Sequence, residues 1–141
     1  AQVANEMANR GFQIWLFGSG KDQITTDEIT EKVEKKHQAN IHNLAGTTSL
    51  IEAVDLLAAC SSVISNDSGL MHVAAAVGCK VIGVYGSTSP EYTPPLAKDV
   101  HIVHTNIECR PCFKRECPLG HLKCLKDLSP GIVIDKLTGA D

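Results

Sequence analysis

Apolar positions along the chain alternate between short continuous runs and longer segments with helical spacing. The runs of strand length are residues 12–17, 41–45, 63–64, 80–85 and 101–104. The segments with apolar side chains three or four positions apart are residues 3–10, 27–38, 50–59, 69–77 and 130–137. Because strands and helices alternate, the pattern predicts an α/β fold: a Rossmann-like parallel sheet flanked by helices and joined by right-handed crossovers.

The stretch at residues 63–78 predicts a buried strand, a polar corner and a helix of small residues that ends in glycine. Three residues of types that cap helices form the corner: Asn66, Asp67 and Ser68. Gly69 reduces side-chain bulk where the helix begins, and His72 lies on its first turn. Unpaired N–H groups and the positive end of the helix dipole then face the corner, which predicts an anion-binding site. The structural alternative is that the corner only caps the helix and that His72 only packs at the surface.

Four of the predicted strands end in small polar residues. These pairs are Gly18-Ser19, Gly46-Thr47, Asp67-Ser68 and Gly86-Ser87. Ligands of open α/β sheets bind outside the carboxyl ends of the strands. The four loops together therefore predict a nucleotide cleft, although the first loop alone would be an ordinary turn because it lacks a complete phosphate-binding fingerprint.

The length and charge of the chain argue against two classes of function. The 141 residues suffice for one domain with a hydrophobic core. The formal net charge of −3 gives no electrostatic argument for nucleic-acid binding, and no apolar run reaches the roughly 18 residues of a membrane span. Residues 1–8 have the pattern of the middle of a helix and no initiator methionine precedes them, so we expect a piece of a longer protein.

Six cysteines are many for a chain of this length. Cys60 and Cys79 lie in apolar contexts that predict buried thiols. The other four lie in a Cys-rich loop at residues 107–125: Cys109, Cys112, Cys117 and Cys124. Their spacing permits a structural zinc site, reduced unligated thiols or disulfides. The enzyme-like remainder of the chain favours the first two, and elemental analysis of protein purified without chelator would decide about zinc.

Residues 66–75 (Asn-Asp-Ser-Gly-Leu-Met-His-Val-Ala-Ala) and residues 85–90 (Tyr-Gly-Ser-Thr-Ser-Pro) carry a resemblance to a known family. With residues 43–46 and the cysteine pattern of the tail, they make the chain similar to the ADP-heptose:lipopolysaccharide heptosyltransferases, glycosyltransferase family 9. The similarity is to the carboxyl-terminal half, and it is strongest to the type II members. The first motif is specific, whereas the cysteine pattern occurs in only part of the family.

The resemblance implies the donor-binding domain of a GT-B glycosyltransferase. Residues 1–141 would form a single nucleotide-sugar-binding domain for ADP-heptose, without the amino-terminal domain that binds the lipid A–core acceptor. The whole enzyme would transfer heptose with inversion to the lipopolysaccharide inner core, at the cytoplasmic face of the inner membrane and in peripheral association with it. It would need no cofactor. The general base would lie in the missing half, so we expect the fragment alone to be inactive.

The family also implies roles for the loop residues, which agree with their chemistry. The catalytic residues would be His72 and Asp67. Ser68 and Gly69 would hold the diphosphate, and His72 would donate a hydrogen bond to it. Asp67, being acidic, would accept from heptose hydroxyls or orient His72. The remaining nucleotide contacts would be Gly46 and Thr47 at the adenosine, Gly18 and Ser19 near the ribose or adenine, and Gly86 and Ser87 on the far side.

Two other functions stay open from the sequence. The chain could be the donor domain of another GT-B enzyme that uses a different sugar nucleotide, since phosphate-binding loops resemble one another. Preference for UDP over ADP would favour that alternative. It could also be a non-catalytic interaction module built on the Cys-rich loop, which would leave the residues from Asp67 to His72 without a role.

Overall fold

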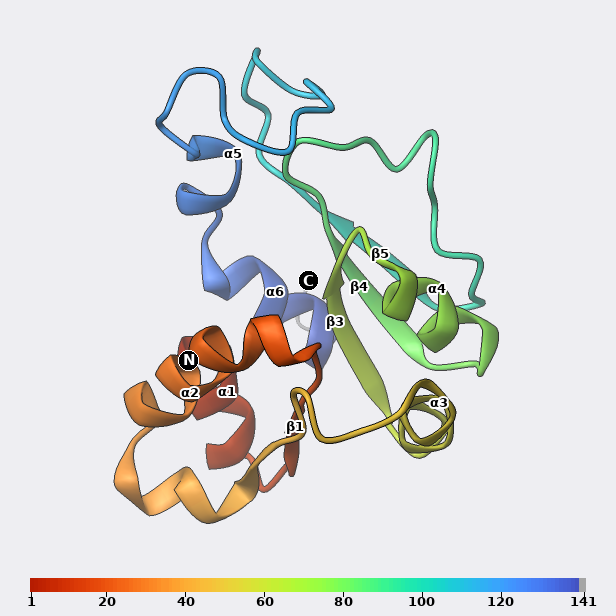
Figure 1. Cartoon of the computed structure of the whole chain (residues 1–141). Coiled ribbons are helices and arrows are strands. Elements are labelled where there is room, and N and C mark those ends of the chain that lie inside the picture. Colours follow the sequence, from red (N-terminus) through yellow and green to blue (C-terminus); the bar gives the residue numbers. More distant parts are fainter. Residues whose placement is uncertain (140–141) are drawn as a thin grey trace. The chain divides into compact units, whose positions relative to one another are not determined.

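The computed structural model describes residues 1–139 and divides into two compact units, Ala1–Ala53 and Val54–Asp141 (Figure 1). All strand pairs among the described residues are parallel. The predicted parallel α/β fold is therefore confirmed. The five predicted strands form, but they belong to two sheets, β1-β2 and β3-β4-β5, and not to one continuous sheet. None of the helices in residues 1–139 has the length and apolar character needed to cross a membrane.

Unit 1 has a small hydrophobic core that packs against a two-stranded sheet. Its elements are α1 (Gln2–Asn9), β1 (Ile14–Leu16), the 3-10 helix η1 (Gly20–Asp22), α2 (Gln23–Lys32), the 3-10 helix η2 (Lys35–Asn40) and β2 (Ile41–Asn43). The core consists of Ala4 and Ala8 of α1 with Val33 and Ile41, and side chains of β1 pack against it. In the sheet, Ile14 pairs with Ile41, so the carboxyl ends of β1 and β2 lie at the same edge.

Both predicted bounds of the helix at residues 27–38 are wrong. α2 begins four residues earlier, at Gln23, because a capping box between Ser19 and Asp22 starts the helical segment at η1. It ends at Lys32, because Val33 has an extended backbone and buries its side chain in the core. The amide of Glu34 then donates to the Asn5 side chain at 2.8 Å, which fixes the break against α1.

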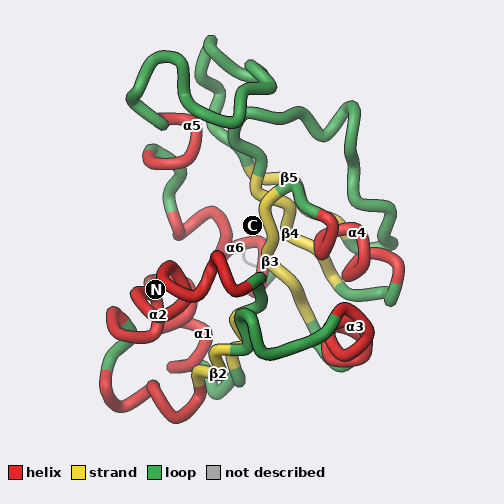
Figure 2. The backbone as a smooth tube through the Cα atoms, in the orientation of Figure 1, coloured by secondary structure: helices red, strands yellow, loops and turns green. Residues whose placement is uncertain are grey.

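Unit 2 is organised around the three-stranded sheet (Figure 2). Its elements are β3 (Ser62–Asn66), α4 (Gly69–Ala76), β4 (Lys80–Val84), β5 (Val100–Val103), α5 (Lys123–Lys126) and α6 (Pro130–Thr138), while α3 (Leu50–Ala58) spans the boundary between the units. Asn66 pairs with Val84, and Val84 with Val103. The loops that follow β3, β4 and β5 therefore leave the sheet at one level.

The core of unit 2 lies between the sheet and α4. α4 packs on β3 and β4 through Met71, Ala74 and Ala75, which are buried. α6 contacts β4 and β5 and lies on the other face of the sheet (Figure 1). Gly78 ends α4 in the left-handed conformation at φ +90°, as predicted from its position.

Gly46→Ala should lower the free energy of unfolding by about 1–3 kcal/mol. Gly46 has φ of +71°, and an added Cβ would lie 2.9 Å from the Cα of Gly20. Urea denaturation measures the effect. Gly20→Ala is the matched control, because a Cβ there meets no described atom within 4 Å. Equal stability of the two variants would contradict a backbone requirement at Gly46.

Candidate functional site

The corner between β3 and α4 leaves the start of the helix open. Ser68 occupies the N-cap position with extended backbone, φ −152° and ψ 165°. Its hydroxyl lies 3.1 Å from the Ser65 hydroxyl and accepts no hydrogen bond from the described amides of α4. The hypothesis that the Ser68 side chain caps the helix is therefore wrong, because that side chain turns to Ser65. An added Cβ at Gly69 would meet no described atom within 4 Å, so space exists over the first turn.

Asp67 and His72 meet at this corner. The Asp67 side chain is only 16% exposed, and its Oδ2 accepts a hydrogen bond of 2.8 Å from the Thr93 hydroxyl. Its Oδ1 lies 4.0 Å from Nε2 of His72, whose side chain is 45% exposed. That distance allows an electrostatic interaction but is too long for a hydrogen bond. The structure thus brings together the two residues predicted to be catalytic, and it holds Asp67 more firmly than His72.

A buried tyrosine fixes Thr93 beneath the corner. Tyr85 follows β4 directly and is fully buried. Its hydroxyl donates to the Thr93 carbonyl at 2.6 Å and lies 3.7 Å from the sulfur of Met71. Burial raises the pKa of Tyr85, and the negative charge of Asp67 raises it further. The phenol therefore stays neutral, and Thr93 links it to the Asp67 carboxylate.

An open hollow lies beside Asp67. It has a volume of about 430 Å³ and is lined by Asp67, Thr88, Tyr92, Thr93 and Phe113, which we call the Asp67 hollow. The rings of Tyr92 and Phe113 meet edge to face, with centroids 5.4 Å apart and an interplanar angle of 87°. Sequence reasoning missed these two rings and both threonines. The only sequence signal was that three of the four follow β4 in a loop with many hydroxyl groups.

The Cys-rich loop is attached to the loop after β4. The guanidinium of Arg110 donates to the carbonyls of Gly86 at 3.0 Å, Thr88 at 3.2 Å and Thr105 at 3.3 Å. The amide of Phe113 donates to the Ser87 carbonyl at 2.8 Å. We refer to these four hydrogen bonds as the Arg110 clamp. The predicted contact residues Gly86 and Ser87 thus use their carbonyls to hold the Cys-rich loop.

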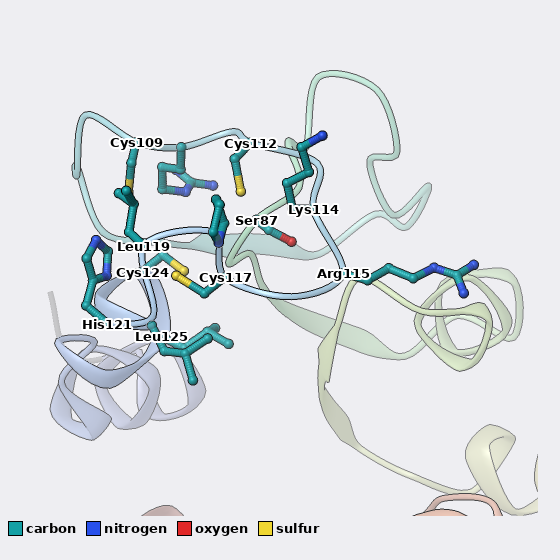
Figure 3. A pocket seen from close by; sticks show the side chains of 13 residues that line it. Ser87, Cys109, Cys112, Lys114, Arg115, Cys117, Leu119, His121, Cys124 and Leu125 are labelled. Carbon is teal, nitrogen blue, oxygen red and sulfur yellow. The ribbon is translucent and has the colours of Figure 1, made fainter.

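The four clustered cysteines line one small pocket, together with Ser87 and His121. Its volume is about 110 Å³ (Figure 3). The sulfur atoms of Cys109, Cys112, Cys117 and Cys124 point into this cysteine pocket, whereas the Arg115 side chain points away from it (Figure 3). All four are free thiols. Within residues 1–139, no three Cys, His, Asp or Glu side chains lie close enough together to hold a metal ion, so the residues as arranged do not fit zinc.

The cysteines differ in their surroundings. Backbone amides lower the pKa of the Cys117 thiol, the amide of Leu122 most strongly, against a smaller opposing effect of burial. Burial raises the pKa values of Cys60 and Cys79. The prediction that Cys79 is buried is confirmed, and its thiol donates to the Leu57 carbonyl at 2.9 Å. Cys60 is partly exposed, which corrects the prediction for that residue.

The two predicted turns of unit 1 meet each other. The amide of Gly46 donates to the Gly18 carbonyl at 2.9 Å, at the carboxyl ends of β1 and β2. The Ser19 hydroxyl and amide donate to the Asp22 carboxylate at 2.8 and 2.7 Å. The Thr47 hydroxyl donates to the Leu44 carbonyl at 3.0 Å. Within unit 1, these side chains stabilise the turns themselves.

Comparison with known proteins places these features in a family context. The sequence profile of glycosyltransferase family 9 (heptosyltransferase) matches residues 1–123. The chain is 39% identical to lipopolysaccharide heptosyltransferase 2 of Salmonella typhimurium over 137 residues, which are 97% of the chain and 39% of that relative. It is 42% identical to lipooligosaccharide heptosyltransferase 2 of Haemophilus ducreyi over 143 aligned positions, covering 97% of the chain and 40% of that relative.

Two solved structures share the fold. The ADP-heptose lps heptosyltransferase II of E. coli superimposes with a TM-score of 0.84 at 36% identity, over 98% of the chain and 39% of that protein. A glycosyl transferase of family 9 from Veillonella parvula gives a TM-score of 0.78 at 25% identity, over 98% of the chain and 39% of that protein. The chain thus spans about two fifths of the length of these relatives.

Tyr85→Phe should lower the free energy of unfolding at pH 7 by about 0.5–1.5 kcal/mol, because it removes the hydrogen bond to Thr93. In the parent chain, stability should also fall as the pH rises above about 10, since an unfolded tyrosine ionises there while buried Tyr85 keeps its proton. The variant should show a smaller alkaline loss. Urea denaturation from pH 7 to 11 measures both effects.

Tyr92→Phe is the control for this experiment, because Tyr92 is 75% exposed. It should leave stability unchanged at neutral pH. Parallel alkaline profiles for the parent chain and Tyr85→Phe would contradict the role of burial at Tyr85.

Proposed function

Because the chain belongs to glycosyltransferase family 9, the heptosyltransferases, we propose that it is the donor-binding part of an inverting heptosyltransferase. The donor would be ADP-heptose, and the product a heptosylated lipopolysaccharide inner core. The family match and the similarity to heptosyltransferases named for lipopolysaccharide support this proposal. The observation that carries it is the open start of α4 beside Asp67 and His72.

The diphosphate of the donor would sit at the start of α4. In an inverting transfer, negative charge grows on the leaving diphosphate as its bond to the sugar breaks. The amides of Ser68 and Gly69 and the positive end of the helix can stabilise that charge without moving. The Ser68 hydroxyl forms a hydrogen bond with the Ser65 hydroxyl and can turn toward a phosphate oxygen. Because the Ser68 side chain does not cap α4, a ligand can bind at the start of the helix.

His72 and Asp67 would have opposite tasks. His72 is exposed one turn into α4, where its ring N–H can donate to a phosphate oxygen. Asp67 is a carboxylate and would repel the diphosphate, so its free acceptor capacity suits sugar hydroxyl groups. The hydrogen bond from Thr93 keeps Asp67 in place. An acceptor hydroxyl would attack the anomeric carbon from the face opposite the diphosphate.

The remaining assignments concern the nucleoside and the rest of the enzyme. Gly46 and Thr47 would contact the adenosine, Gly18 and Ser19 the ribose or adenine, and Gly86 and Ser87 the far side of the donor. The lipid A–core acceptor would bind to another domain, which also supplies the general base. The complete enzyme would act at the cytoplasmic face of the inner membrane in peripheral association with it, with no nucleic-acid partner.

Titration of the chain with ADP, UDP and GDP by isothermal calorimetry tests the donor assignment. We expect ADP to bind best. Gly69→Leu should weaken ADP binding by at least about tenfold, because a side chain at this position covers the turn before it and no described atom fills that space. The circular dichroism spectrum of the variant should match that of the parent chain, because the fold should be unchanged.

Gly131→Leu is the matched control, since Gly131 lies in the first turn of another helix, α6. It should bind ADP like the parent chain. Preference for UDP or GDP would assign a different sugar nucleotide, and unchanged ADP binding by Gly69→Leu would reject the diphosphate site at α4.

We further propose that the transfer needs no cofactor and that the four clustered cysteines stay reduced and unligated. Protein purified without chelator should then contain no stoichiometric zinc by elemental analysis, and six thiols should react after denaturation. Zinc that is lost in Cys117→Ser but retained in Cys60→Ser would contradict this and assign a metal to the cysteine pocket.

A further inference from the structure

The Asp67 hollow has two aromatic walls to which the proposed function assigns no role. We propose that Tyr92 and Phe113 form a platform for a sugar ring, whose hydroxyl groups bind to Asp67, Thr88 and Thr93. This inference rests on the proposed function and names a subsite within it. It adds a sugar-binding surface to the site, with two aromatic side chains to which the sequence analysis gave no role.

The size and lining of the hollow suit a small ligand. Its volume of about 430 Å³ lies within the range of roughly 300–1,000 Å³ that is usual for ligand pockets. Tyr92 is 75% exposed and Phe113 is 53% exposed. Single exposed apolar residues are common on protein surfaces. Here two rings contact each other and share one hollow with a carboxylate, which is a combination of apolar surface and hydrogen-bonding groups.

Those groups select a neutral ligand with many hydroxyl groups. A sugar ring has a face of C–H groups, which can pack on aromatic rings, and an edge of hydroxyl groups, which donate to a carboxylate. A phosphate in the hollow would be repelled by Asp67. A purely apolar ligand would remove water from the carboxylate without replacing its hydrogen bonds. The sugar ring satisfies both parts of the lining.

The platform is built on fixed backbone. The amide of Phe113 donates to the Ser87 carbonyl at 2.8 Å, within the Arg110 clamp. The amide of Tyr92 donates to the carbonyl of Ser89, which is itself buried, at 3.2 Å. The next residue, Thr93, is held by Tyr85. Because these bonds exist before a ligand binds, little backbone ordering opposes binding.

The position of the hollow allows the bound sugar ring to come from either of two ligands, the donor or the acceptor. Asp67 precedes Gly69 by two residues, so a sugar bonded to a diphosphate at the start of α4 would reach the hollow past Asp67. The ring could equally belong to the acceptor: although another domain would bind the lipid A–core, its reacting saccharide must approach the same sugar. Both ligands present the same chemistry, and binding measurements separate them.

Isothermal calorimetry of the 141-residue chain with ADP-heptose, ADP and an oligosaccharide released from the lipopolysaccharide core tests the platform. If the ring is the donor's, Tyr92→Ala and Phe113→Ala should weaken ADP-heptose binding by about 5- to 20-fold and leave ADP binding unchanged. If it is the acceptor's, only oligosaccharide binding should weaken.

Leu96→Ala is the matched control, because Leu96 lies in the same connection between β4 and β5, is 84% exposed and does not line the hollow. It should change no affinity. Unchanged binding of all three ligands in both alanine variants would overturn the platform. Absence of ADP binding in the parent chain would instead reject the proposed donor site. The titration with the oligosaccharide would then still test whether Tyr92 and Phe113 bind a sugar ring.

Discussion

The hydrogen bond from the buried Tyr85 hydroxyl to the Thr93 carbonyl connects the core of unit 2 to the residues around Asp67 at its surface. Tyr85 directly follows the central strand β4 and contacts Met71 of α4, so its hydroxyl has a fixed position. From there the loop after β4 is held at Thr93, whose hydroxyl in turn holds Asp67. A phenol buried without a partner would cost roughly 1–3 kcal/mol. The loop therefore cannot move away from the sheet without leaving that group unsatisfied.

The Arg110 clamp gives the Cys-rich loop a structural role in the same unit. The Arg110 guanidinium donates to three carbonyls from two segments, and the Phe113 amide donates a hydrogen bond to a fourth carbonyl, that of Ser87. Guanidinium groups suit such bridging because their donors have a planar, fixed geometry. A separate interaction module would be expected to make few bonds to the sheet. Here the loop instead supplies one wall of the Asp67 hollow, so it forms part of the candidate site.

The sequence predicted what short-range patterns encode. The strands, the small-residue helix α4 and its end at Gly78 follow from apolar spacing and glycine chemistry, and the structure confirms them. The helix predicted at residues 27–38 failed because Val33 is drawn into a core made with α1, which local spacing does not show. Thr93 and Phe113 were missed for a related reason. Thr93 acts through hydrogen bonds with Tyr85 and Asp67, and Phe113 through a hydrogen bond with Ser87. Local sequence patterns do not show these contacts.

The β3–α4 corner separates two kinds of electrostatic surface over three residues. The start of α4 presents amides and the positive end of a dipole, which attract anions. Asp67 presents a carboxylate, which repels anions and accepts hydrogen bonds from neutral hydroxyl groups. A sugar nucleotide has the same order of parts, with a charged diphosphate bonded to an uncharged polyhydroxylated ring. A ligand placed in the reverse orientation would put its diphosphate against Asp67 and its sugar at the helix start. In the proposed function, the corner would therefore favour one orientation of the donor, and that orientation would bring the sugar ring toward the aromatic walls of the Asp67 hollow.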